Sequence, residues 1–99
     1  MSEQRMDYDQ AEEMSRELDM AAEELQEMIA NMQTVAERLE GGALLGRGGD
    51  AMVLALRSRF CPAIERLSDK LKEQAEYVRT EMYDMMEAER RISGLFGDS

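Results

Sequence analysis

The stretch LEGGALLGRGGD, residues 39–50, decides how this chain folds. It holds five of the seven glycines, and long segments with a helical spacing of apolar residues lie on both sides of it. Glycine destabilises a helix interior by about 1 kcal/mol relative to alanine and readily adopts the positive φ that ends a helix. Residues 41–49 are therefore predicted to form an elbow between two helices, with Leu44 and Leu45 as an apolar plug inside it.

Length and composition allow one small helical domain, residues 1–99. Charged residues make up 34% of the chain and aromatic residues 5%, with one proline and no tryptophan. This profile is typical of coiled coils and helical bundles. Acidic chains can also be disordered, but the 43% apolar content is regularly spaced, which favours a folded helical protein.

The net charge of −10 lies mostly in the first part of the chain. Residues 1–40 carry twelve acidic and three basic side chains, whereas residues 41–99 carry ten and nine. Such a first half repels nucleic acids and anionic membranes. A basic partner helix or a positively charged channel is the more plausible partner.

A first helix is predicted over about residues 8–40. Its apolar residues alternate in steps of three and four, which is the pattern of a left-handed coiled-coil seam. The seam consists of Ala11, Met14, Leu18, Ala21, Leu25, Met28, Met32, Val35 and Leu39. Ala22, Ile29 and Ala36 widen the stripe toward what a multi-helix bundle requires.

A second helix is predicted over about residues 50–93, with Asp50 as its N-cap. Its apolar positions are Met52, Leu56, Phe60, Ile64, Leu67 and Leu71, and then, after a phase slip near Leu71, Ala75, Val78, Met82, Met85 and Ile92. Pro62 removes one intrahelical hydrogen bond and should kink or break the helix. The tail, residues 94–99, is expected to leave the helix with Leu95 and Phe96 as an exposed apolar pair.

The predicted fold is an all-α antiparallel helical hairpin, two copies of which form a four-helix bundle. A single hairpin gives each helix one neighbour, while each apolar stripe is wide enough for two, and burial of the remainder favours docking of a second hairpin. A homodimer is the default because two-fold pairs are the commonest assembly. The acidic first helices would repel one another where they approach, which keeps a heterodimer with a related hairpin open. The residues expected in the core or dimer seam are Leu18, Leu25, Met28, Met32, Val35, Leu39, Phe60, Ile64, Leu67, Leu71, Val78 and Met82.

No pattern in the sequence predicts catalysis, a cofactor or a metal. Cys61 is the only cysteine and there is no histidine, so neither a disulfide scaffold nor a Cys-His nucleophile is available; a small buried thiol is expected. The acids face outward, the methionines at 14, 28, 32, 82 and 85 fall on seam positions as core filling, and GGALLGRGGD lacks the ending of a phosphate loop. The chain is expected to have no membrane span and no cleavable signal peptide.

The motif Tyr-x-x-x-Glu occurs three times, as Tyr8/Glu12, Tyr77/Glu81 and Tyr83/Glu87. Residues four apart share one face of a helix, so each pair could form a recognisable patch. In so acidic a chain the spacing also arises readily by chance.

Taken together, these features resemble the WXG family of small ESAT-like proteins, which type VII secretion systems export. Leu44-Leu45-Gly46 stands where that family has Trp-x-Gly, with Leu44 in place of tryptophan, and Pro62 matches a proline that many members carry. The resemblance implies helical hairpins paired as four-helix bundles and an export signal near the C-terminal end. Here that signal would be Tyr83 and Glu87, with Leu95 and Phe96, presented to the secretion ATPase.

The resemblance leads to the hypothesis of a non-enzymatic protein, made in the cytoplasm and secreted as a dimeric substrate or co-substrate of a type VII system. The alternative is a cytosolic adaptor or chaperone that pairs with the helical N-terminal domain of a larger secreted toxin. A third interpretation, a plain structural coiled coil, predicts an extended rod instead of a hairpin.

Overall fold

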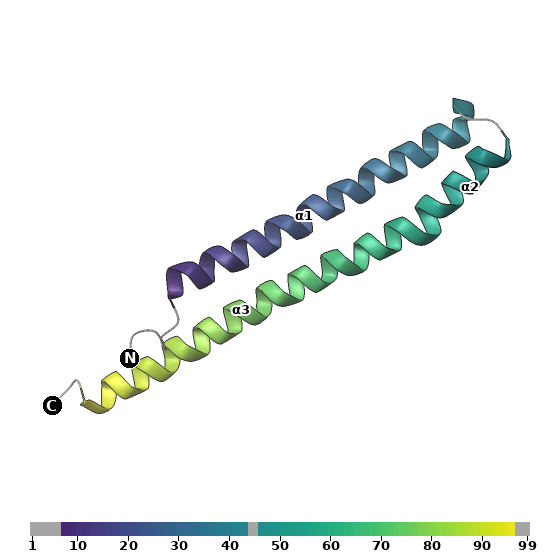
Figure 1. The fold of residues 1–99 in the computed structure, drawn as a ribbon. Coiled ribbons are helices and arrows are strands. Elements are labelled where there is room, and N and C mark those ends of the chain that lie inside the picture. Colours follow the sequence, from purple (N-terminus) through teal and green to yellow (C-terminus); the bar gives the residue numbers. More distant parts are fainter. Residues whose placement is uncertain (1–6, 44–45, 97–99) are drawn as a thin grey trace.

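The chain folds into a hairpin of two long helical arms. The structure is a computed structural model and describes residues 7–43 and 46–96. Its elements are, in chain order, α1 (Tyr8–Arg38), a π-helical turn (Leu39–Ala43), α2 (Arg47–Ala55), a second π-helical turn (Leu56–Phe60) and α3 (Cys61–Phe96). The last three form one continuous arm that runs back antiparallel to α1 (Figure 1). The described residues contain no strand, so the prediction of an all-α antiparallel hairpin is confirmed.

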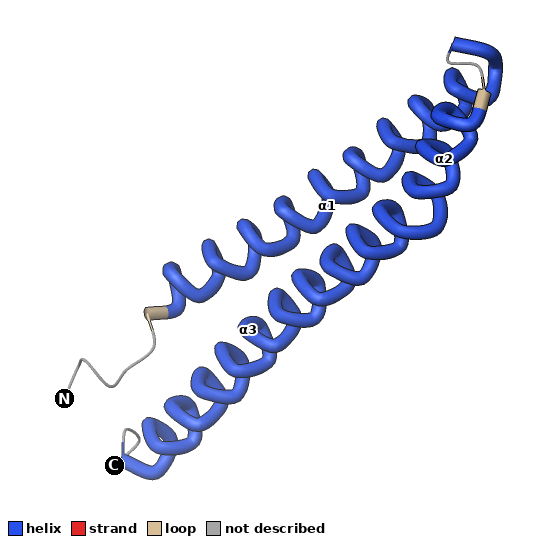
Figure 2. Tube along the Cα trace, turned by 45° about the vertical axis from the view of Figure 1, so that its right-hand side comes forward, coloured by secondary structure: helices blue, strands red, loops and turns tan. Residues whose placement is uncertain are grey.

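The hairpin is long and thin, with principal extents of 79 × 20 × 17 Å. Figure 2 shows, from a second direction, that the two arms lie side by side, with the elbow at one end and the start of α1 and the end of α3 toward the other. Two helices alone provide a narrow core. A helix pair of this shape therefore leaves much of its apolar surface uncovered.

Asp7 caps the first helix. Its carboxylate oxygen Oδ1 accepts hydrogen bonds from the backbone N–H groups of Asp9, at 3.1 Å, and Gln10, at 3.2 Å. These are two of the four N–H groups at a helix start that have no partner within the helix. The start of α1 at Tyr8 agrees with the predicted boundary.

Two glycines turn the chain at the elbow. Gly42 has φ 103° and ψ 8°, and Gly46 has φ 91° and ψ −165°. Both values of φ lie in the region that residues with a Cβ avoid, which explains why glycine is needed at these two positions. Leu44 and Leu45, the predicted apolar plug, lie outside the described residues.

The elbow is shorter than predicted, because the second arm begins at Arg47 instead of residue 50. Gly48 and Gly49 are helical residues of α2, and Gly46 occupies the N-cap position. The prediction that Asp50 is the N-cap is therefore wrong. Asp50 lies in the first turn, where its backbone N–H donates to the carbonyl oxygen of Gly46 at 3.2 Å. A carboxylate there is still favourable because it faces the positive end of the helix dipole.

Pro62 neither breaks nor ends the helix. The turn before it, Leu56–Phe60, is π-helical, and the N–H of Cys61 donates to the carbonyl oxygen of Leu56, five residues back. Because proline has no N–H of its own, the helix is already short of one bond here, and a wider turn accommodates the change. The helix continues without interruption into α3.

The two arms pack along a line of small buried side chains. From Ser15 onward on α1, and from Cys61 onward on α3, successive members are seven residues apart, which keeps them in one row of each helix. On α1 the buried residues are Ala11, Ser15, Ala22, Ile29 and Ala36, and on α3 they are Cys61, Ser68, Ala75 and Met82. Leu18, Leu25, Met32, Leu39, Ile64, Leu71 and Val78 from the predicted seam are half-buried beside this line.

The line of contact therefore runs along one edge of the predicted seam instead of its centre. Met28, Val35, Phe60 and Leu67 were expected in a core or dimer seam and are exposed in the hairpin, whereas Met82 is buried. The predicted phase slip near Leu71 is absent from the buried row, which continues unbroken from Cys61 to Met82. The slip was predicted because Phe60 and Leu67 are apolar and were counted in the seam. In the structure both side chains lie on the flank of the second arm.

The second arm also ends later than predicted. Helix α3 continues through Ser93 and Gly94 to Phe96, three residues beyond the expected exit. Because α1 begins only at Tyr8, the last turns of α3 extend past it. Leu95 is 77% exposed on this part of the helix, in agreement with the expectation for that residue.

Candidate interaction surface

One flank of the hairpin is held by polar contacts between the arms. We call it the locked face; it comprises Asp19, Gln26 and Glu40 of the first arm and Arg57, Glu65 and Arg79 of the second. Gln26 Nε2 donates to Glu65 Oε2 at 2.7 Å and to Ser68 Oγ at 3.1 Å. Ser68 Oγ in turn donates to the carbonyl oxygen of Ala22 at 3.1 Å, and its residue is completely buried.

Two ion pairs extend the locked face toward both ends. Arg57 forms a bidentate pair with Glu40 at 2.5 and 2.7 Å, and Arg79 pairs with Asp19. The hydrogen bonds that Arg57 donates to Glu40 raise the pKa of Arg57, and the hydrogen bond that Arg79 donates to Asp19 raises the pKa of Arg79. Both guanidinium groups therefore stay charged up to a pH above the ordinary arginine pKa. Because these pairs are solvent-exposed, they contribute more to the register of the arms than to stability.

The opposite flank is mainly apolar, and the inter-arm hydrogen bonds and ion pairs given above all lie away from it. We call it the apolar face; it comprises Met14, Ala21, Met28 and Val35 of α1, with Met52, Phe60 and Leu67 of the second arm. Apart from the half-buried Ala21, these side chains are between 45% and 53% exposed. The residues of α1 follow one another at intervals of seven, so they form one row directly beside the buried line.

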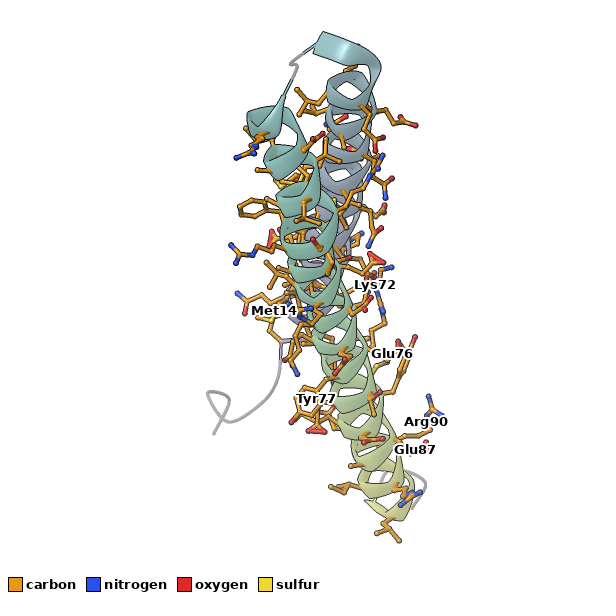
Figure 3. The ribbon with its side chains drawn as sticks, turned by 90° about the vertical axis from the view of Figure 1, so that its right-hand side faces the viewer. Met14, Lys72, Glu76, Tyr77, Glu87 and Arg90 are labelled. Carbon is orange, nitrogen blue, oxygen red and sulfur yellow. The ribbon has the colours of Figure 1, made fainter. Side chains whose placement is uncertain are left out.

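Figure 3 is turned by 90° from Figure 1, so that the two flanks lie to either side of the second arm. Met14 and Tyr77 project to one side of the hairpin, and Lys72 and Glu76 project to the other. On the second arm, the row that holds Phe60 and Leu67 continues at seven-residue intervals with Gln74 and Glu81, and these two residues are polar. The apolar face is therefore widest in the half next to the elbow.

A shallow hollow of about 360 Å³ lies on the same flank near the open end of the hairpin. Met14 and Ala11 of α1 and Tyr77, Val78 and Glu81 of α3 contribute to its lining. The hollow is an open groove between two helices, and the polar residues Asp7 and Gln10 also border it. Its mainly apolar lining is suited to receiving an apolar side chain of a partner.

The structure brings only part of the predicted export signal together. Tyr83 is 62% exposed, and Glu87, one turn later on the same side of α3, pairs with Arg90 at 3.6 Å (Figure 3). Leu95 lies about 120° around the helix from Tyr83 and about 18 Å further along it, at 100° and 1.5 Å per residue. Phe96 ends the helix. A single flat partner surface could not contact Tyr83 and Leu95 together.

The other Tyr-x-x-x-Glu pairs occupy different surroundings. Tyr77 is 61% exposed at the hollow of the apolar face, next to Glu81. Tyr83 instead borders a hollow of about 290 Å³ on the other flank, beside Ser15, Arg16 and Arg79. The pairs at Tyr77 and Tyr83 therefore differ in the face they present, although their spacing is identical.

The methionines predicted to fill the core divide into two groups. Met82 is buried, and Met32 and Met85 are half-buried, in agreement with that prediction. Met14 and Met28 are exposed on the apolar face. Cys61 is buried, as expected.

Within residues 7–43 and 46–96, no group of three or more Cys, Asp or Glu side chains is arranged to hold a metal ion. In the same part of the chain, no helix is long and apolar enough to cross a membrane.

Sequence reasoning missed the polar residues that hold the arms together. Ser15 and Ser68 are buried in the contact between the arms, and Gln26 bonds across it, but the apolar pattern of the sequence selected none of the three. The seven-residue interval of small side chains at Cys61, Ser68 and Ala75 is the signal that could have revealed this row.

No protein-family model, no curated protein and no solved structure matches this chain.

Proposed function

We propose that this chain is a non-enzymatic helical hairpin of the WXG or ESAT-like type, which pairs with a second helical hairpin and is a substrate or co-substrate of a type VII secretion system. The observation that carries the proposal is the division of the hairpin into a locked face and an apolar face. One flank has its own polar contacts, while the other presents a row of large apolar side chains to solvent. Exposed apolar rows of this extent mark surfaces for association.

A second copy of the chain is the occupant that we propose for the apolar face. The row from Met14 to Val35 spans about 30 Å at 1.5 Å per residue. Across the two helices, which are about 20 Å wide together, this gives on the order of 600 Å² on each partner, close to the ~800 Å² of a standard interface. Two copies would then form the four-helix bundle that the sequence predicts.

The export part of the proposal depends on Tyr83 and Glu87. These side chains lie away from the apolar face, so pairing would leave them accessible to a secretion ATPase. The ATPase would then bind this part of the helix surface in a groove of its own. We expect Tyr83→Ala with Glu87→Ala to abolish secretion and to leave pairing unchanged.

The test is the amount of protein in the culture medium of cells that carry a type VII system, with a cytosolic marker to exclude lysis. Tyr77→Ala with Glu81→Ala removes the same spacing on the flank proposed for pairing, so its secretion is compared together with its pairing, measured by sedimentation. A strain without the secretion ATPase gives the level of non-specific release. Secretion of the Tyr83 and Glu87 variant at the parental level would contradict the proposed signal.

The second candidate is a cytosolic adaptor that pairs with the helical domain of a larger secreted toxin. The charge of α1 favours it: the helix carries nine acidic and two basic side chains, whereas α3 carries eight and six. Contact between two copies of α1 would therefore be repulsive, and a less acidic partner would avoid this cost. A monomeric purified chain that forms a stable complex only when co-expressed with such a partner would favour the adaptor.

A further inference from the structure

Three exposed methionines lie on the apolar face, and we propose that they are oxidation sites whose conversion to sulfoxide separates the paired hairpins. This inference rests on the proposed function, because it requires the apolar face to be the pairing surface. The chemical class of reagent is a peroxide. The sites are Met14, Met28 and Met52.

All three side chains are accessible in the single hairpin. Met14 is 53% exposed, Met28 45% and Met52 48%. Oxidation of methionine follows the exposure of its sulfur, so these residues should react before the buried Met82. Whenever a pair dissociates into single hairpins, these three side chains become accessible to a peroxide.

The π-helical turn places Met52 in this row. Across an unbroken α-helix, eight residues would rotate Met52 about 80° away from Phe60. The wider turn at Leu56–Phe60 takes up one additional residue. Met52 therefore returns to the same flank as Phe60 and Leu67.

The reaction transfers one oxygen atom to each sulfur. The sulfur lone pair attacks one peroxide oxygen, so an S–O bond forms and the O–O bond breaks. With hydrogen peroxide, the other oxygen leaves as water after proton transfer. The thioether loses two electrons and the peroxide gains them, so no further reductant or oxidant is needed.

The product is incompatible with an apolar interface. A thioether is flexible and packs well against aliphatic side chains, whereas a sulfoxide is polar and a strong hydrogen-bond acceptor. In the half of the face next to the elbow, which holds Met28 and Met52, the apolar side chains Val35, Phe60 and Leu67 offer no donor. The hollow beside Met14 also holds Gln10 and Tyr77, which can donate, so the effect at Met14 should be smaller. Burial of an unpartnered acceptor should raise the dissociation constant of the pair by about tenfold to a hundredfold.

The chain provides an internal control in two exposed methionines that lie off the apolar face. Met20 is 57% exposed. It follows the half-buried Leu18 by two residues, which is a rotation of about 200° around α1, so it points away from α3. Met86 is 36% exposed and lies seven residues after Arg79, in the row of the locked face. Both should be oxidised without affecting pairing.

The experiment compares the full chain with two variants before and after hydrogen peroxide, using sedimentation equilibrium for pairing and peptide mass spectrometry for sulfoxide. The first variant replaces Met14, Met28 and Met52 by leucine, and the second replaces Met20 and Met86 by leucine. We expect peroxide to weaken pairing of the parental chain and the second variant, while the first variant stays paired. Treatment of the oxidised parental chain with methionine sulfoxide reductases should restore pairing, which does not depend on any variant folding.

Two results would overturn the inference: loss of pairing by the oxidised first variant, or unchanged pairing of parental protein that carries sulfoxide at all three sites. If the untreated parental chain does not pair at any concentration, the proposed function fails first, and this inference fails with it. The two failures are distinguishable because the second is seen before peroxide is added.

Discussion

The hydroxyl of Ser68 on α3 donates a hydrogen bond to the backbone carbonyl oxygen of Ala22 on α1, over 3.1 Å. Both residues are completely buried. The contact brings two small, fully buried side chains together in the middle part of the hairpin. It also fixes the register of the arms, because a shift of one turn would place a larger side chain opposite Ala22.

Replacement of Ser68 tests this contact. We expect Ser68→Ala to lower the free energy of unfolding by about 1 kcal/mol, the usual value of one buried hydrogen bond. Ser68→Leu should destabilise by about 1–3 kcal/mol or more, since there is no space beside Ala22 for added carbons. Urea denaturation followed by circular dichroism measures both, with Ser93→Ala on the exposed end of α3 as control. Equal stability of Ser68→Leu and the parental chain would contradict the packing described above.

The two glycines Gly46 and Gly48 should respond oppositely to alanine. Gly46 has φ 91°, so a Cβ there is strained, and we expect Gly46→Ala to destabilise the hairpin by about 1 kcal/mol or more. Gly48 lies inside α2 with no atom within 4 Å of an added Cβ, so Gly48→Ala should stabilise by about 0.5–1 kcal/mol. Thermal unfolding of the two single variants measures the difference. The same sign for both would indicate that α2 does not begin at Arg47.

The ion pair between Asp19 and Arg79 should depend on salt but not on alkaline pH. A double-mutant cycle with Asp19→Asn and Arg79→Gln isolates the coupling between the two side chains. Because the folded-state pKa of Arg79 is raised, the stabilisation is complete below the ordinary arginine pKa and is lost only as pH rises through the higher folded value. We therefore expect the same coupling at pH 7 and pH 10, and a smaller one at about 1 M salt, where screening is strong. A coupling that disappears by pH 10 would contradict this assignment.

Charges introduced on the apolar face should prevent pairing without unfolding the hairpin. Met28→Glu with Leu67→Glu adds two charges to side chains that are 45% and 52% exposed, so each arm keeps its own structure. Sedimentation should show a change from dimer to monomer at micromolar concentration, while the helical circular dichroism signal is retained. Met20→Glu, on the outer side of α1, is the control and should stay paired. A paired double variant would mean that another surface forms the interface.

The elbow and the helical arms could be predicted from local sequence. Clustered glycines exclude a continuous helix, and steps of three and four specify an amphipathic helix whatever it packs against. For this reason the hairpin and the start at Tyr8 agree with expectation. Boundaries depend on single dihedral angles, so the assignment of Asp50 as N-cap was wrong by one turn.

Less of the candidate surface could be predicted from the sequence. Apolar character placed Met28, Val35, Phe60 and Leu67 in a core or dimer seam, but it could not divide the stripe between the hairpin's own contact line and a free flank. Small buried residues such as Ser68 do not register as apolar at all. These small residues matter because they let the two helix backbones come close together, and this depends on the residues that the other helix presents.

The order of residues alone determined that this chain is helical, that it bends at a cluster of glycines and that its helices carry wide apolar stripes, because these depend on local backbone preferences and periodicity. Only the tertiary structure decided which part of each stripe is used inside the hairpin. That choice depends on where side chains are small enough for two backbones to approach and where Gln26, Ser68 and the paired charges can meet. Contacts of this kind join residues that are 17 to 60 positions apart in the chain, and no local pattern specifies them.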